Sequence, residues 1–93
     1  MTDGQASIST EILARYAGDA AREVEGVRGL AGRRGARVHD DGSVELHLAV
    51  AWGASIPAVG RCVQERVRDY LRHMADLEPA GVDVIVDEIG PMQ

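Results

Sequence analysis

The sequence predicts an α+β fold, a two-layer sandwich in which two helices pack on one face of a small, mainly antiparallel sheet of three or four strands. Two segments with apolar residues at helical spacing, about 10–24 and 56–76, predict the helices. Apolar residues that alternate with other residues over 44–52 and 82–89 predict the longest strands. The order helix, two or three strands, helix, strand favours both helices on one sheet face.

The chain of 93 residues is long enough for one domain. We expect this domain to span residues 7–90, after a flexible N-terminus at residues 1–6. The start, MTDGQAS, lacks the features of a signal peptide, and no apolar run approaches the ~18 residues of a membrane span. The single cysteine excludes an internal disulfide and fits a reducing compartment. We therefore expect a cytoplasmic protein without direct membrane insertion.

The net charge of −5 argues against nucleic acid as a partner, because binding phosphates requires a basic surface. One basic stretch, GRRGAR, stands out on this acidic chain. Its side chains are a candidate contact for an acidic partner or an anionic headgroup, and a solvated loop is the alternative. The residues concerned are Arg33, Arg34 and Arg37.

The first helix has signals at both ends. Ser9 or Thr10 is a suitable N-cap, and Glu11 carries the negative charge that a helix start favours. Gly26 follows where a left-handed residue commonly ends a helix. A short strand, GVRGLAG, comes next. The helical positions that we expect in the core are Ile12, Leu13, Tyr16, Ala17, Ala20 and Val24.

The stretch around HDDGS predicts a hairpin that admits two registers. A two-residue turn places Val38 opposite Glu45, which breaks the apolar face of the pair. A three-residue loop with Gly42 in a left-handed conformation places Val38 opposite Val44 and Arg37 opposite Glu45. We favour the second register because it keeps the apolar face intact. The expected core face of the second hairpin strand is Val44, Leu46, Leu48, Val50 and Trp52.

The stretch WGASIP could be a ligand-binding turn or the joint between a strand and a helix. Gly53 leaves the strand, Ser55 caps the second helix and Pro57 lies in its first turn. A phosphate-binding loop needs more glycines and usually a basic residue, so we favour the joint. The apolar stripe of this helix is Ile56, Val59, Val63, Val67, Tyr70, Leu71 and Met74.

The sheet face away from the helices is a candidate interaction surface. The alanines and the isoleucine on it predict an apolar strip between charged residues, which suits self-association or a protein partner. Plain exposure to solvent is the alternative, because scattered apolar residues are common on surfaces. The outer-face residues are Glu45, His47, Ala49, Ala51, Asp83, Ile85 and Asp87.

We find no catalytic or cofactor site in the sequence. His39, Glu45 and His47 share the outer face in the favoured register, but the spacing along the hairpin predicts that the two rings are too far apart to share a metal ion. Cys62 is expected to be a half-buried, inert thiol. The four serines have capping or turn roles, and no nucleophile elbow is present. We therefore expect no metal, no cofactor and no enzymatic activity.

Three segments together resemble the alkaline shock protein and general-stress family, also called envelope stress response proteins. They are ISTEILARYAGDAAREVEGVRGL, DGSVELHLAVAWGASIPAVGRCVQERVRDYLRHM and MADLEPAGVDVIVDEI, and they cover residues 7–89. The chain departs from the family pattern at Trp52, where tyrosine is more common, and at Met74, which is not followed by Thr-Gly. It also lacks the charged tail of many members.

The resemblance implies a non-enzymatic bacterial protein that self-associates and acts through protein contacts near the membrane. It further implies a small membrane-anchored partner and a role in envelope homeostasis under alkaline or general stress. No catalytic residue carries over from the family. The alternative is a small accessory, carrier or metal-binding domain that regulates a cell-envelope enzyme.

Overall fold

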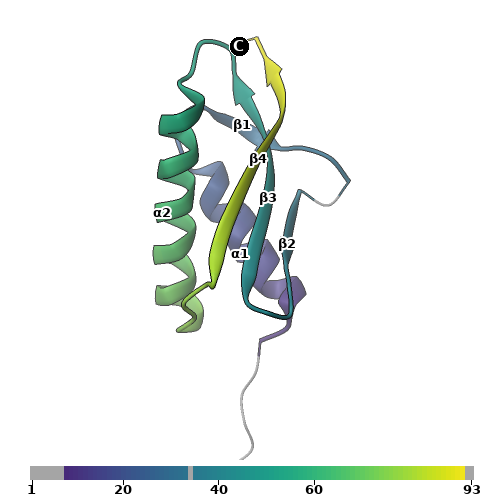
Figure 1. The fold of residues 1–93 in the computed structure, drawn as a ribbon, viewed down its shortest axis with the longest axis vertical. Helices are drawn as coiled ribbons and strands as arrows, with labels where there is room; N and C mark the ends of the chain where they lie inside the picture. Colours follow the sequence, from purple (N-terminus) through teal and green to yellow (C-terminus); the bar gives the residue numbers. More distant parts are fainter. Residues whose placement is uncertain (1–7, 34, 92–93) are drawn as a thin grey trace, which may run out of the picture.

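Two helices cover one face of a four-stranded sheet in the computed structural model (Figure 1), which describes residues 8–33 and 35–91. The predicted two-layer α+β fold is confirmed. The N-terminus predicted to be flexible, residues 1–6, lies outside the described residues. The elements are α1 (Thr10–Arg22), β1 (Val27–Leu30), β2 (Ala36–Val38), β3 (Ser43–Ala51), α2 (Ile56–Ala75) and β4 (Gly81–Gly90).

The sheet is organised around β3, which contacts every other strand. Both β1 and β2 pair antiparallel with one edge of β3, β1 with its C-terminal half and β2 with its N-terminal half. On the other edge, β4 pairs with β3 in parallel, and α2 makes the crossover that a parallel pair requires. Two of the three pairings are therefore antiparallel, while the longest ladder is the parallel one.

The hairpin adopts the favoured register, with Val38 opposite Val44 and Arg37 opposite Glu45. The backbone N–H of His39 donates to the carbonyl of Ser43 at 2.9 Å, which closes a three-residue loop. Gly42 has φ 89°, the left-handed conformation that this loop needs and that glycine adopts at little cost. The apolar alternation therefore selects the loop.

Both helices begin at the predicted serines. The Ser9 hydroxyl accepts from the N–H of Ile12 at 3.2 Å, and the Ser55 hydroxyl accepts from the N–H of Ala58 at 3.3 Å. Pro57 lies in the first turn of α2, so the WGASIP stretch is a joint between strand and helix. Helix α1 ends at Arg22, two residues earlier than predicted, before Gly26 with φ 97°.

The core lies between β3 and the two helices and is aliphatic, as the composition predicts. One face of β3 is completely buried, at Val44, Leu46, Leu48 and Val50. The rings of Tyr16 and Tyr70 pack edge to face at its margin, with centroids 5.9 Å apart. The helical residues that complete the core are Leu13, Ala17, Ala20, Ala21, Val24, Val59, Val63, Val67 and Leu71.

Four residues predicted to face the core are exposed instead. Ile12 and Ile56 lie in the first turns of their helices and Met74 in the last turn of α2, so the predicted stripes fail at the helix ends. Trp52 is 69% exposed, because β3 ends at Ala51 and the chain leaves the sheet in a turn at Gly53, where φ is 91°. Alternation along the strand therefore fails at its last position.

Truncating Leu46 to alanine should lower the free energy of unfolding by about 2–5 kcal/mol, because the buried side chain leaves a cavity among rigid neighbours. Urea denaturation of the purified chain measures the change. Ile12→Ala is the matched control and should cost less than about 1 kcal/mol, since Ile12 is 43% exposed and alanine favours helix. Equal losses for the two variants would contradict this packing.

Candidate functional site

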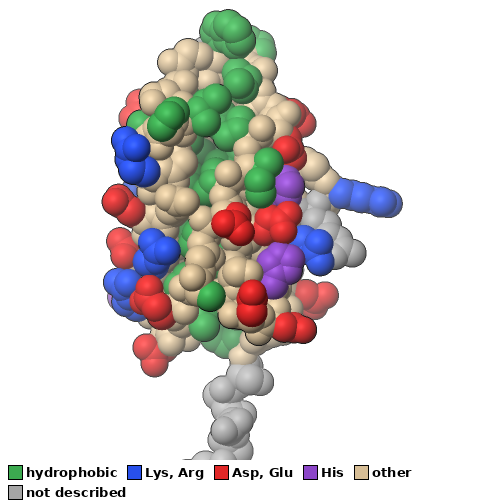
Figure 2. Space-filling view, viewed as in Figure 1, with side chains coloured by type: hydrophobic (Ala, Val, Ile, Leu, Met, Phe, Trp, Pro, Cys, Tyr) green, Lys and Arg blue, Asp and Glu red, His purple; other side chains and the backbone are tan. Residues whose placement is uncertain are grey.

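The sheet face away from the helices carries a chain of hydrogen-bonded histidines and carboxylates. The Nε2 of His39 lies 3.0 Å from Oε1 of Glu45, and the other oxygen of that carboxylate lies 2.6 Å from Nε2 of His47. The Nδ1 of His47 lies 2.8 Å from Oδ2 of Asp87. Histidine and acidic side chains gather beside β4 in Figure 2. We call these four residues the histidine chain.

Three different strand features bring the histidine chain together. Alternation along β3 places Glu45 and His47 on one face. The hairpin register returns His39, just after β2, to the side of Glu45. The ladder between β3 and β4 shifts at Leu48/Ala49, so that Asp87 is an extra residue on β4 and its carboxylate reaches His47.

His47 is held between two carboxylates, and only the protonated imidazole can donate from both ring nitrogens. The hydrogen bond to Glu45 and then the one to Asp87 raise the pKa of His47 above its ordinary value of 6.5. The same bonds act on the carboxylate, because hydrogen bonds from His47 and then from His39 lower the pKa of Glu45.

The two rings are closer than the hairpin spacing predicts, because each reaches one oxygen of the Glu45 carboxylate. They nevertheless do not form a ligand set. Over residues 8–33 and 35–91, the structure contains no group of three or more His, Cys, Asp or Glu side chains that could hold a metal ion. The arrangement is an ionic chain that connects the hairpin, β3 and β4.

The predicted apolar strip on this face offers little accessible apolar surface. Ala49 and Ala51 are each only 7% exposed. The guanidinium of Arg28 lies against Gly90, the partner of Ala51 in the ladder, and leaves no room there for a Cβ atom. Ile85 is 36% exposed, and Asp83 is exposed beside it. A role of the strip in self-association stays a prediction.

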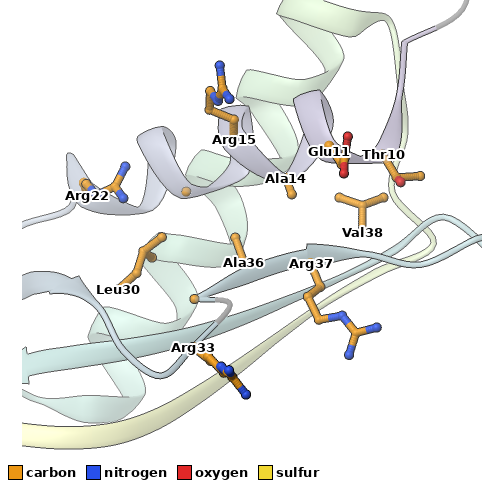
Figure 3. A pocket seen from close by; sticks show the side chains of 12 residues that line it. Thr10, Glu11, Ala14, Arg15, Arg22, Leu30, Arg33, Ala36, Arg37 and Val38 are labelled. Atoms are coloured by element: carbon orange, nitrogen blue, oxygen red, sulfur yellow. The ribbon is translucent and has the colours of Figure 1, made fainter.

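The basic stretch borders a hollow of about 710 Å³ between α1 and β2 (Figure 3). Ala36 and Val38 point into the hollow, whereas Arg33 and Arg37 point away from α1. Arg33 and Arg37 therefore do not point into the hollow. Arg34 lies outside the described residues. Arg33 and Arg37 are exposed, and their anion contact stays a prediction.

A second hollow, of about 680 Å³, lies where β1 begins and α2 starts, and most of its lining is apolar. Trp52, which is 69% exposed, belongs to this lining. Ile56, at the start of α2, and Ile89, near the end of β4, are 40% and 48% exposed, and we call Trp52, Ile56 and Ile89 the tryptophan end. Figure 2 shows hydrophobic side chains at the end of the molecule where β3 and β4 terminate. Cys62 lines this hollow and is exposed, not half-buried as predicted, because it faces off the core stripe of α2.

Sequence reasoning missed the tryptophan end. The alternation of β3 predicts that Trp52 points into the core, and the helical stripe predicts the same for Ile56. The signal that could have revealed it is Trp52-Gly53 at the end of a strand, because a glycine in a left-handed turn redirects the preceding side chain.

No helix in residues 8–33 and 35–91 is both long enough and apolar enough to cross a membrane.

The histidine chain should make stability fall at alkaline pH. The pKa of His47 is raised in the folded state. Its contribution to folding stability is therefore fully present below about pH 6.5 and is lost as the pH rises through the pKa of the folded state. Urea midpoints should therefore drop more between about pH 6 and pH 9 for the wild type than for His47→Gln. His73→Gln, on exposed α2 surface, is the matched control and should keep the wild-type slope.

The stabilising effect of Glu45 has the opposite pH dependence, because its pKa is lowered. Its contribution to stability is present above its ordinary pKa of 4.5 and is lost as the pH falls through the pKa of the folded state. An NMR titration resolves the two groups. In Glu45→Gln the titration midpoint of His47 should move down, and an unchanged midpoint would contradict the pairing.

Among solved structures, the fold resembles the MamM C-terminal domain. One such structure has a TM-score of 0.56 and 18% identity, and covers 86% of this chain and 99% of that one. A variant of the same domain has a TM-score of 0.55 and 17% identity, and the match covers 91% of this chain and 100% of the variant. At this identity the likeness shows the fold alone.

Two sequence comparisons identify the family. The uncharacterized protein YqhY of Bacillus subtilis (strain 168) is 33% identical over 92 residues, which cover 80% of this chain and 68% of YqhY. Residues 35–91, from β2 to the end of β4, match a family described by its cell envelope-related function. The predicted resemblance is thereby confirmed: the chain belongs to the alkaline shock protein 23 family.

Proposed function

We propose that this chain is a non-enzymatic, cell envelope-related protein that acts by self-association and by binding other proteins near the membrane. The observation that carries the proposal is the family match over residues 35–91, which includes the central strand, α2 and β4. Self-association, a cytoplasmic location and a small membrane-anchored partner are the finer parts of the proposal.

The character of the described residues supports a binding role over a catalytic one. No polar or charged residue among them is buried. Groups that act in acid–base catalysis are usually tuned by burial, whereas the histidine chain lies in partial contact with water. The tryptophan end offers large exposed apolar side chains, which are typical of interface centres.

The alternative is an accessory, carrier or metal-binding domain that regulates an envelope enzyme. A metal version would use His39, Glu45 and His47, and both imidazole rings are already hydrogen-bonded to Glu45. A metal would have to displace these bonds. An accessory role in the broader sense is compatible with the same surfaces and differs only in the partner.

The experiment is co-capture from the cells that produce the chain. Two copies of the full chain with different tags are expressed together, the membranes are solubilised with detergent, and one tag is captured for quantitative mass spectrometry. We expect enrichment of the second tagged copy together with a small membrane protein, because the proposal requires both contacts. A copy of the chain mixed in only after lysis controls for association during purification.

Recovery of neither the second copy nor any membrane protein would contradict the proposal. Capture of soluble enzymes alone would favour the accessory role.

A further inference from the structure

We propose that the tryptophan end is a contact between two copies of this chain, related by a two-fold axis, in which Trp52 of each copy enters the hollow of the other. This inference rests on the proposed self-association and adds the surface that makes it. Three observations carry it: the hollow, the position of the exposed Trp52 in its wall, and the charges among its lining residues.

The hollow is preformed and apolar. Val24 and Val59 belong to the buried core and form part of its lining, together with Val27 and Ala58. Gly26 packs so tightly against α2 that a Cβ atom there would lie 2.9 Å from a methyl group of Val59. Gly26 and Val59 are therefore in close contact within the lining of the hollow. Its volume of about 680 Å³ can admit an aromatic side chain, which buries roughly 150–250 Å² on binding.

Trp52 is anchored through its backbone while its side chain projects. The N–H of Trp52 donates to the carbonyl of Gly90 at 2.6 Å, and the left-handed Gly53 fixes the turn that follows. At 69% exposure, the indole is the most exposed large hydrophobic side chain in residues 8–33 and 35–91. Because the backbone of Trp52 is already fixed, binding has only its side chain to order, which lowers the entropic cost of association.

The charges at the rim favour a second copy as the occupant. Glu25 and Arg28 belong to the lining of the hollow and are both exposed, and the Arg28 guanidinium extends to Gly90 at the end of β4. Neither residue forms an ion pair within residues 8–33 and 35–91. A two-fold axis brings the glutamate of one copy to the arginine of the other, so this pair is self-complementary. The chain as a whole carries a charge of −5, so two copies repel each other less at this balanced end than elsewhere.

Trp52 is the only tryptophan of the chain, so its fluorescence reports directly on this contact. Sedimentation equilibrium and tryptophan emission are measured on the full chain over the same dilution series. We expect the emission to shift to longer wavelength in step with dissociation, because dilution returns the indole to water.

Two sets of variants test the residues. Trp52→Ser should raise the dissociation constant of the dimer at least about tenfold, because a central tryptophan commonly dominates an interface. Met74→Ser, equally apolar and 46% exposed at the other end of α2, is the matched control and should leave association unchanged. Glu25→Arg should weaken association, and adding Arg28→Glu should restore it. Circular dichroism confirms that each variant is folded.

The outcomes separate this inference from the proposed function. If the chain associates while Trp52 emission does not depend on concentration, the contact lies elsewhere, and self-association stands without this surface. If the chain stays monomeric and the emission shifts only when vesicles of phosphatidylglycerol and phosphatidylethanolamine are added, the tryptophan end contacts lipid and the inference is wrong. Failure of the charge exchange to restore association would overturn the two-fold arrangement.

Discussion

The fold depends on the complete burial of one face of β3. Leu46, Leu48 and Val50 are shielded from water by both helices, and their alternation fixes which side of the strand faces the helices and which faces solvent. The register with β2 follows from matching Val38 to Val44. With β1, β2 and β4 all paired to this one strand, an error in its placement would displace every other strand of the sheet.

The outer face of the same strand is stabilised differently, by ionic hydrogen bonds in partial contact with water. These bonds connect β3 to β4, which pairs with no other strand within residues 8–33 and 35–91. An exposed edge strand invites pairing with other chains, and charged side chains and bulges are common protections. Asp83, Asp87 and Glu88 supply the charge on β4, and the register shift supplies the irregularity. Asp87 therefore both protects the edge and attaches it to His47.

Much of the fold was predictable from the sequence because it depends on short-range patterns. The caps at Ser9 and Ser55 and the loop at Gly42 each follow from neighbouring residues. Most of the candidate site was not predictable. The bond from Asp87 to His47 spans 40 residues and needs both the parallel pairing and an extra residue on β4, and neither leaves a local signal. Alternation likewise cannot predict that Trp52 lies beyond the last row that the helices cover.

The histidine chain and the tryptophan end are physically connected through β4. His47 attaches to this strand at Asp87, and three residues later Gly90 accepts the hydrogen bond that fixes the backbone of Trp52. Between them lies only the last part of the parallel ladder, where Val50 pairs with Ile89. Loss of a proton from His47 removes one of its two carboxylate bonds, because a neutral ring donates from one nitrogen. The histidine chain and the tryptophan end therefore share one edge strand, which holds His47 at Asp87 and the backbone of Trp52 at Gly90.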